Sequence, residues 1–593
     1  MSGNRKLPLS AMFATLAILL GLVVHATYLA RVGADAVYMD TLRLLWQWSE
    51  FRQGNLSLLQ LWGQQGSPHS GLLFQALLAA NAAWFGLDAL LANRATGLVI
   101  AAVAALLCAA YLSDARRMQA PPSAIVVAVV VLAVTGLCFS LSGFELLTLD
   151  LGLGLWVKNL LVFILFLAHA WTLRNDRGPG LGAALLLSAY GLAVVVLCAM
   201  GWSYAMVGAI LAVQALHHLA MRRLPAPTQL VLPLVLLSAL LAVTVGKRLL
   251  FGGGEESAAA LRSDMPGQLL LSLASTFVNA EAAARLALPT ALLLLLGALL
   301  AIAFVAAALI RVRDRRASLM PVHLIAYASL CALSFVLARG AEGDQMVMAS
   351  RYHMDLFPGL VGTVWILSMR SQGLSPSGRR ATIALAGSLL LLAAVLQAGQ
   401  FAVEWKTAPY RKAVFEAMND ALRDGVPDQA AADLLQAPLG DARNAVAVMR
   451  RERLAVFRGQ QAMPAAGGVA CSTDWRMGEG WHAPEAGGTW SSAQATFTVP
   501  ACSCGYRASL LLPEGHLERD VTIDGPADAG ALLARRLLPG QAVEVVVPAS
   551  VHAQHYVLRV SPTTVPVAAG INADTRTLGV YMGKPLVVCA ASR

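Results

Sequence analysis

A few charged residues lie at the ends of long apolar runs, and their side chains are of types that can share one reaction. Asp40 follows the first apolar run, in the stretch 37–41. A carboxylate there can take a proton from a hydroxyl group or bind a metal ion. Arg351, Arg339 and Lys158 lie near the ends of other runs, and such cations can hold a phosphate leaving group. We therefore predict a site where a carboxylate activates an acceptor and cations stabilise a departing phosphate.

Other polar residues lie near these positions and are candidates for the same site: His69, Glu145, Asp150 and Tyr352. The simplest alternative is structural. In that case Asp40 caps a helix or stays solvated, and the arginines only extend their charges from the membrane into water.

The elements that must position these residues are those of a membrane protein. Hydrophobic residues make up 57% of the chain and charged residues 13%, and the mean hydropathy is +0.63. Soluble domains carry about 25% charged residues. About eleven apolar runs have roughly the length that crosses a bilayer. We predict a polytopic α-helical membrane protein with spans near residues 9–29, 96–112, 122–141, 153–172, 180–200, 203–219, 227–245, 287–310, 319–338, 357–369 and 381–402.

The net charge of +10 follows from the loops and does not indicate a nucleic-acid partner. Alternate loops carry fifteen basic residues against three acidic ones, Asp114, Asp176 and Asp314. The positive-inside rule places these loops in the cytoplasm. The N-terminus is then cytoplasmic. Eleven spans put the C-terminal part outside, which is the periplasm for a bacterial inner membrane.

Changes in composition predict three parts. Residues 1–403 form the transmembrane domain, and its first external loop, 31–95, has Trp and Leu among polar residues, as in short helices at a membrane surface. Residues 404–468 have helical spacing and dense charge, typical of a helical connector. Residues 469–593 show strand patterns at 495–499, 508–512, 543–547, 555–560 and 586–588. Such spacing predicts an all-β sandwich or jelly roll.

The cysteines follow the same division. Four lie in apolar runs and are expected to be small core residues: Cys108, Cys138, Cys198 and Cys331. Four lie in the polar C-terminal region: Cys471, Cys502, Cys504 and Cys589. An even set in an exported domain predicts disulfides. Because Cys502 and Cys504 are too close to pair comfortably, each is expected to reach Cys471 or Cys589.

Ionisable residues outside the basic loops gather near one predicted face of the membrane. Lys158 is the clearest exception inside a span, and it lies near the outer end of that span. A transporter usually has polar groups near the midplane, so this distribution favours an enzyme at the outer leaflet. A polyprenyl-phosphate sugar suits such a site, because its tail lies among the helices and its phosphate at the surface.

Two stretches resemble the GT-C glycosyltransferases of bacterial membranes. The first is similar to the first external loop of that group and comprises residues 40, 44–45, 54–58, 61–62, 69 and 73–75. The second is similar to the last external loop and comprises residues 339–340 and 350–352. The resemblance covers about residues 8–400. It implies a sugar transferase with a polyprenyl-linked donor and with Asp40 as catalytic acid or base. Many GT-C loops carry paired acidic residues, whereas Met39 and Thr41 flank Asp40. This departure weakens the case for a divalent metal, Mg²⁺ or Mn²⁺, which stays an open alternative.

The C-terminal region resembles a carbohydrate-binding-type jelly roll of some bacterial glycan enzymes. The similar segments are residues 480–485, 489–491 and 574–580. This resemblance implies that Trp481 and Trp490 stack on sugar rings. The alternative is that both indoles pack in the core of the sandwich.

These observations predict an inner-membrane glycosyltransferase. It would move a sugar from a polyprenyl-phosphate carrier to a glycan, lipid or protein acceptor on the periplasmic face. Two other classes are a transporter or flippase of lipid-linked sugars and a non-catalytic glycan-assembly protein. The enzyme requires a groove near Asp40 that opens to both lipid and periplasm, which the assembly protein does not need. Its expected partners are the donor, the acceptor and membrane lipid.

Overall fold

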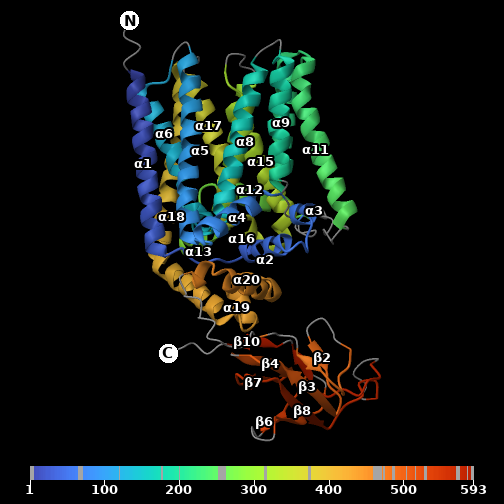
Figure 1. Cartoon of the computed structure of the whole chain (residues 1–593). Helices are drawn as coiled ribbons and strands as arrows, with labels where there is room; N and C mark the ends of the chain where they lie inside the picture. The colour runs from blue at the N-terminus through green and yellow to red at the C-terminus, as the bar shows by residue number, and fades with distance from the viewer. Residues whose placement is uncertain are drawn as a thin grey trace. The chain divides into compact units, whose positions relative to one another are not determined.

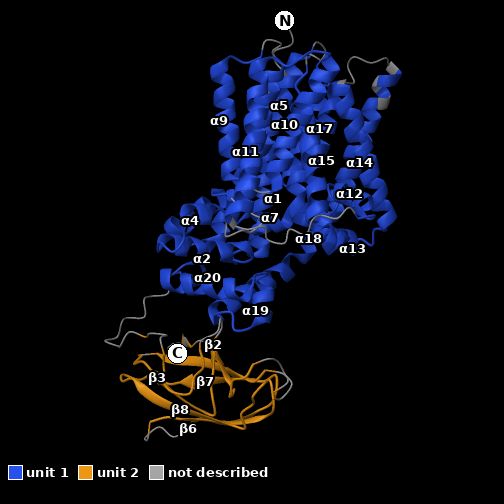
Figure 2. Cartoon of the chain, turned by 90° about the vertical axis from the view of Figure 1, so that its right-hand side faces the viewer, with its two compact units in different colours: residues 1–459 blue, residues 460–593 orange. Residues whose placement is uncertain are grey.

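The computed structural model contains helices up to residue 457 and strands after it. The chain divides into two compact units, residues 1–459 and 460–593 (Figure 2). The residues that the structure describes are 6–63, 71–118, 121–174, 178–198, 201–251, 262–312, 317–370, 376–458, 471, 475–483, 488–502, 504–513, 516–526, 531–568, 574–583 and 585–588.

Nine helices in the described part of the chain are long and apolar enough to cross a membrane. They are α1 (Lys6–Val32), α5 (Ala89–Arg117), α6 (Ala124–Cys138), α8 (Gly152–Leu173), α10 (Gly201–Met221), α11 (Pro227–Phe251), α14 (Thr290–Arg311), α15 (Met320–Arg339) and α18 (Pro376–Asp424). The span that begins with α6 continues through η2 (Leu141–Gly143) and α7 (Phe144–Thr148). The other two predicted spans are also helical, as α9 (Leu181–Leu197) and α17 (His353–Arg370). The prediction of a helical membrane protein is therefore confirmed.

Short helices gather at the end of the bundle opposite the start of α1 (Figure 1). The first external loop contains α2 (Asp40–Arg52), α3 (Leu58–Gly63) and α4 (Leu73–Phe85). Later loops contribute α12 (Met265–Ala274), α13 (Ala280–Arg285), α16 (Asp344–Val347) and the one-turn helices η3 (Gly340–Glu342) and η4 (Ser350–Tyr352). The first loop ends before residue 95, because α5 begins at Ala89. The Asp88 carboxylate caps α5 by accepting from the Leu91 backbone N–H at 2.8 Å.

The last membrane helix and the connector are continuous. α18 has 49 residues, so at 1.5 Å per residue it is roughly 73 Å long, against a hydrocarbon thickness of about 30 Å. The expected boundary at residue 403 therefore falls inside a helix. After α18, α19 (Gln429–Leu434) and α20 (Leu439–Glu452) pack back on the first loop. The Trp46 indole N–H donates to Asp441 at 3.0 Å, and Arg52 pairs with Glu452 at 2.9 Å.

The second unit consists of two antiparallel sheets. One has the strand order β1 (Arg476–Met477), β3 (Gln494–Val499), β8 (Gln554–Ser561), β5 (Arg519–Asp524) and β6 (Ala531–Leu537). The other has the order β10 (Leu586–Val588), β4 (Gly505–Leu511), β9 (Tyr581–Gly583) and β2 (Gly488–Trp490), with β7 (Ala542–Val547) also paired to β4. Burial alternates along β7, as expected when one face is covered. Phe497 and Leu558 of the first sheet share a core with Leu510 and Val545 of the second.

Candidate functional site

The N-terminus of α2 carries the carboxylate that the sequence singled out. Asp40 is the first residue of α2. A negative charge at this position interacts favourably with the positive end of the helix dipole. Its side chain is 45% exposed and accepts a charged hydrogen bond from Arg43, one turn later, at 3.1 Å. The preceding residue, Met39, has a positive φ of 56°, and its backbone N–H donates to the carbonyl of Leu435 at 2.9 Å. The connector thus fixes the point at which α2 begins.

A second carboxylate, Asp150, lies beside the same turn of α2. The hydroxyl of Thr41 donates to Asp150 at 2.7 Å, and the backbone N–H of Leu151 donates to it at 3.1 Å. Asp150 is 8% exposed. Burial raises its pKa to about 6, although both hydrogen bonds lower it. A cavity of about 20 Å³ adjoins the side chain, enough room for roughly one water molecule.

A third carboxylate, Glu145 of α7, is held by η4. Arg351 donates to Glu145 at 2.9 Å, and the Ser350 hydroxyl donates to it at 3.0 Å. Burial acts to lower the pKa of Arg351, but the charge of Glu145 outweighs it and the pKa is raised. The guanidinium therefore stays charged. The Tyr352 ring stacks on Phe335 with centroids 3.9 Å apart, which fixes the direction of η4.

Tyr38 is a buried phenol that precedes α2. Burial raises the pKa of its hydroxyl, and the negative charges of Glu145 and Asp150 raise it further. The phenol therefore stays protonated under the influence of both negative charges. We call the polar residues around the first turn of α2 and around α7 the outer cluster: Tyr38, Asp40, Thr41, Glu145, Asp150, Ser350 and Arg351.

The connector adds a residue that the sequence did not suggest. The Arg411 guanidinium carbon lies 3.5 Å from the ring centroid of Phe144 in α7. Arg411 also pairs with Glu281 at 2.8 Å and with Glu404, which accepts a hydrogen bond from Tyr28 at 2.7 Å. In the sequence Arg411 is one of several charged residues in a helical segment. Nothing near it in the sequence therefore indicated its contact with Phe144.

Two predicted phosphate-binding residues have their partners outside the outer cluster. Arg339 ends α15, is 41% exposed and pairs with Glu342 at 2.7 Å. Lys158 is enclosed between membrane helices, and its ammonium donates to Asp355 of α17 at 2.7 Å and to the Tyr327 hydroxyl at 3.2 Å. Both members of the Lys158–Asp355 pair are 1% exposed. We therefore leave Lys158 out of the site. His69 lies outside the described residues.

Buried polar groups inside the bundle correct one expectation. The sequence suggested spans almost free of ionisable groups, yet His169 and His323 also lie fully enclosed, in α8 and α15. Polar groups are thus not confined to one end of the bundle, and their distribution does not by itself separate an enzyme from a transporter.

The two tryptophans predicted to stack on sugars, Trp481 and Trp490, contact other residues of the second unit. The Trp481 indole N–H donates to the carbonyl of Thr496 at 2.7 Å, and its ring meets Phe497 edge-on. Trp490 is 9% exposed and contacts the rings of His516 and Tyr581. Most of the Trp490 surface is therefore covered by protein, as the core-packing alternative requires.

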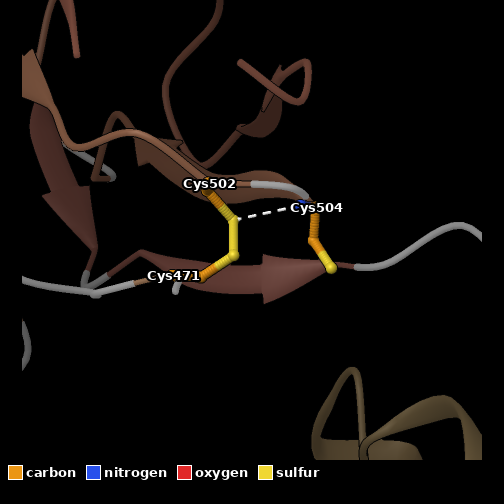
Figure 3. A group of neighbouring side chains, drawn as sticks. All are labelled: Cys471, Cys502 and Cys504. Carbon is orange, nitrogen blue, oxygen red and sulfur yellow. Dashed lines mark hydrogen bonds between the residues drawn. A yellow bond between two sulfur atoms is a disulfide. The ribbon is translucent and has the colours of Figure 1, made fainter. Parts of the chain in front are cut away.

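The cysteines of the second unit form disulfides, as predicted. Cys471 is bonded to Cys502, and the backbone N–H of Cys504 points at the Cys502 sulfur (Figure 3). Cys504 is also disulfide-bonded, and Cys589 lies outside the described residues. The four cysteines of the membrane helices are free and buried.

No carboxylate cluster in the described residues has metal-binding geometry. There the only group of three or more possible ligands within 4.8 Å is that of Cys471, Cys502 and Cys504. Sulfurs in a disulfide are not thiolates and do not bind metal as thiolates do, so these residues form a covalent crosslink. Comparison of the chain with protein-family models, with curated proteins and with solved structures gives no match.

Proposed function

We propose that the chain is a GT-C-type glycosyltransferase of the bacterial inner membrane, with the outer cluster on the periplasmic side. It transfers a sugar from a polyprenyl-phosphate donor to a glycan, lipid or protein acceptor. One observation supports this most: Asp40 begins α2, and the next residue, Thr41, donates to a second carboxylate, Asp150, at one end of a membrane-type bundle.

The chemistry assigns a different task to each group. Asp40 is solvent-accessible, so it takes the proton of the acceptor hydroxyl while that oxygen bonds to the anomeric carbon. The bond from that carbon to the phosphate oxygen breaks, and the polyprenyl phosphate leaves with the electron pair. Arg351 donates hydrogen bonds to the phosphate as its charge grows. Asp150 is enclosed and holds Thr41, so it positions the turn that carries Asp40.

An apolar cavity offers a place for the lipid tail. Its volume is about 240 Å³, and its walls come from α1, α6 and α18, including Gly21, Gly136 and Phe401. Ser140 and Gln397 also line it and are hydrogen-bonded to each other. The chain continues from Ser140 through η2 into α7, which carries Glu145. A tail in this cavity therefore leads towards the Glu145–Arg351 pair.

In the same proposal the second unit is a jelly roll that binds the acceptor.

Replacement of Asp40 by asparagine tests the assignment. A positioned base contributes about 10²–10⁴-fold in rate, so transfer should fall by about that factor while the protein still folds. Asp35→Asn is the matched control, because Asp35 is exposed and only accepts from Asn419 at 3.0 Å. Normal transfer by the Asp40→Asn variant would return Asp40 to a capping role.

A transporter of lipid-linked sugars is the second candidate, and the buried Lys158–Asp355 pair inside the bundle favours it. Assay in detergent micelles separates the two functions, since micelles have no compartments. The enzyme forms the glycosylated product there from the lipid-linked donor and acceptor. A transporter forms none and moves the lipid-linked sugar only in sealed vesicles.

A further inference from the structure

Two histidines form a closed chain of contacts between membrane helices. The Nδ1 atom of His169 in α8 lies 2.8 Å from Nε2 of His323 in α15. The other nitrogen of His323, Nδ1, lies 2.9 Å from the carbonyl oxygen of Leu319. The other nitrogen of His169, Nε2, lies 3.1 Å from Oε1 of Gln214 in α10. All four ring nitrogens are therefore within hydrogen-bonding distance of a partner.

A proline in α11 fixes the orientation of the Gln214 amide. Pro233 has no N–H, so the carbonyl of Gln229, four residues earlier, lacks its usual helical donor. The Gln214 side-chain nitrogen, Nε2, donates to that carbonyl at 3.1 Å. If the amide were turned over, two oxygens would face each other. The Gln214 oxygen must therefore face His169.

The number of protons in this chain of contacts follows from its ends. A backbone carbonyl and an amide oxygen only accept hydrogen bonds, so each of the three contacts needs one proton from an imidazole. Two neutral imidazoles supply one N–H each. One contact then joins two acceptors, which is unfavourable in a dry interior. With a third proton, all three contacts are hydrogen bonds.

Among the described residues, no acidic group pairs with this extra charge. In the described part of the chain, neither ring is hydrogen-bonded to a carboxylate, and the titratable neighbours that act on His169 are His217 and His218 of α10. Phe166 stacks on His323 with centroids 5.2 Å apart and meets Tyr327 edge-on. Phe166 thus lies between the rings of His323 and Tyr327. On the far side of Tyr327, the charges of Lys158 and Asp355 neutralise each other. Burial opposes a charge here, and the third hydrogen bond that the extra proton completes acts in the opposite direction.

We propose that His169 and His323 form a binding site for one excess proton inside the membrane helices. The pair binds one proton beyond the two of the neutral rings and no second, because two imidazolium ions in contact would repel. The bound proton completes the hydrogen bonds that join α8, α10 and α15. This site is separate from the outer cluster and does not depend on the proposed transferase activity.

Nitrogen NMR of the full-length protein, labelled at histidine and solubilised in detergent, tests the proposal. The His169→Gln and His323→Gln variants assign the signals. We titrate from about pH 8 to about pH 5, the range in which imidazole normally changes charge. The wild-type pair should gain one proton, so that three of its four ring nitrogens are protonated.

The Gln214→Leu variant removes one accepting oxygen, which leaves two contacts for two protons. Its histidine pair should stay neutral over the same range. The control is Gln75→Leu, since Gln75 is also a buried glutamine but lies in α4, and this variant should keep the third proton. A wild-type pair that stays neutral down to about pH 5, or that gains two protons, would overturn the proposal. Retention of the third proton in Gln214→Leu would also overturn it. If that variant does not fold, the wild-type titration alone decides.

Discussion

Replacement of Asp150 by asparagine should stabilise the protein at neutral pH. The aspartate is 8% exposed and accepts hydrogen bonds from Thr41 and from the backbone of Leu151. Burial raises its pKa to about 6 in the folded chain, whereas an unfolded aspartate ionises near pH 3.9. Asparagine keeps an oxygen for Thr41 and removes the charge whose burial is unfavourable.

The sign and size of the effect follow from proton linkage. The folded-state pKa of Asp150 is the higher one, so between about pH 4 and pH 6 the folded chain keeps a proton that the unfolded chain has lost. The stability contributed by that proton is complete below about pH 4 and is lost as the pH rises through about 6. A difference of roughly two pH units corresponds to about 3 kcal/mol. The Asp150→Asn variant has no such loss. At pH 8 its free energy of unfolding should therefore exceed that of the wild type by up to about 3 kcal/mol.

The assay is the free energy of unfolding in mixed detergent micelles at about pH 4, 6 and 8, for the wild type and the variant. The advantage of the variant should be smallest at the lowest pH and largest at the highest. Asp35→Asn is the control for the loss of one carboxylate, because Asp35 is exposed. An advantage that does not change with pH, or a loss of stability at pH 8, would refute the assignment of a buried, weakly acidic carboxylate.

Three further predictions concern other parts of the chain. Lys158→Met leaves Asp355 buried without its partner and should lower the free energy of unfolding by about 3–5 kcal/mol. The double variant with Asp355→Leu should recover most of that loss. A double variant as unstable as Lys158→Met would contradict this prediction. Arg351→Ala removes a charge-assisted hydrogen bond to the donor phosphate, worth roughly 1.5–3 kcal/mol. The KM for the lipid-linked donor should therefore rise about tenfold or more. An unchanged KM would leave Arg351 a purely structural role. Thiol labelling of the unfolded, unreduced protein should find at most five reactive thiols among its eight cysteines, because Cys471, Cys502 and Cys504 are disulfide-bonded. Eight reactive thiols would disprove these bonds.

The sequence was sufficient for features that depend on neighbouring residues. Each of the eleven apolar runs became a helix, because about 20 apolar residues must satisfy their backbone hydrogen bonds internally. The five predicted strands overlap observed ones, since alternating burial is a local pattern. The predicted boundary at residue 403 does not coincide with a helix end, because α18 continues through the change from apolar to charged residues.

Part of the outer cluster was also accessible from the sequence. Asp40, Glu145, Asp150 and Arg351 stood out because charged residues are rare beside apolar runs. Their grouping did not follow from the sequence. Thr41 and Asp150 are 109 residues apart, and nothing near either one indicates that the first turn of α2 lies over the loop before α8.

The sequence alone determined which segments form apolar helices of membrane length and which form polar helices or strands, because transfer of apolar side chains out of water acts on each segment separately. The tertiary structure decided the partners: Lys158 with Asp355 across 197 residues, and His169 with His323 across 154. Lys158 could serve a phosphate at the membrane surface or a carboxylate inside the bundle. Only the order in which the helices pack chooses between them, because the energy of a charge depends on the groups that enclose it.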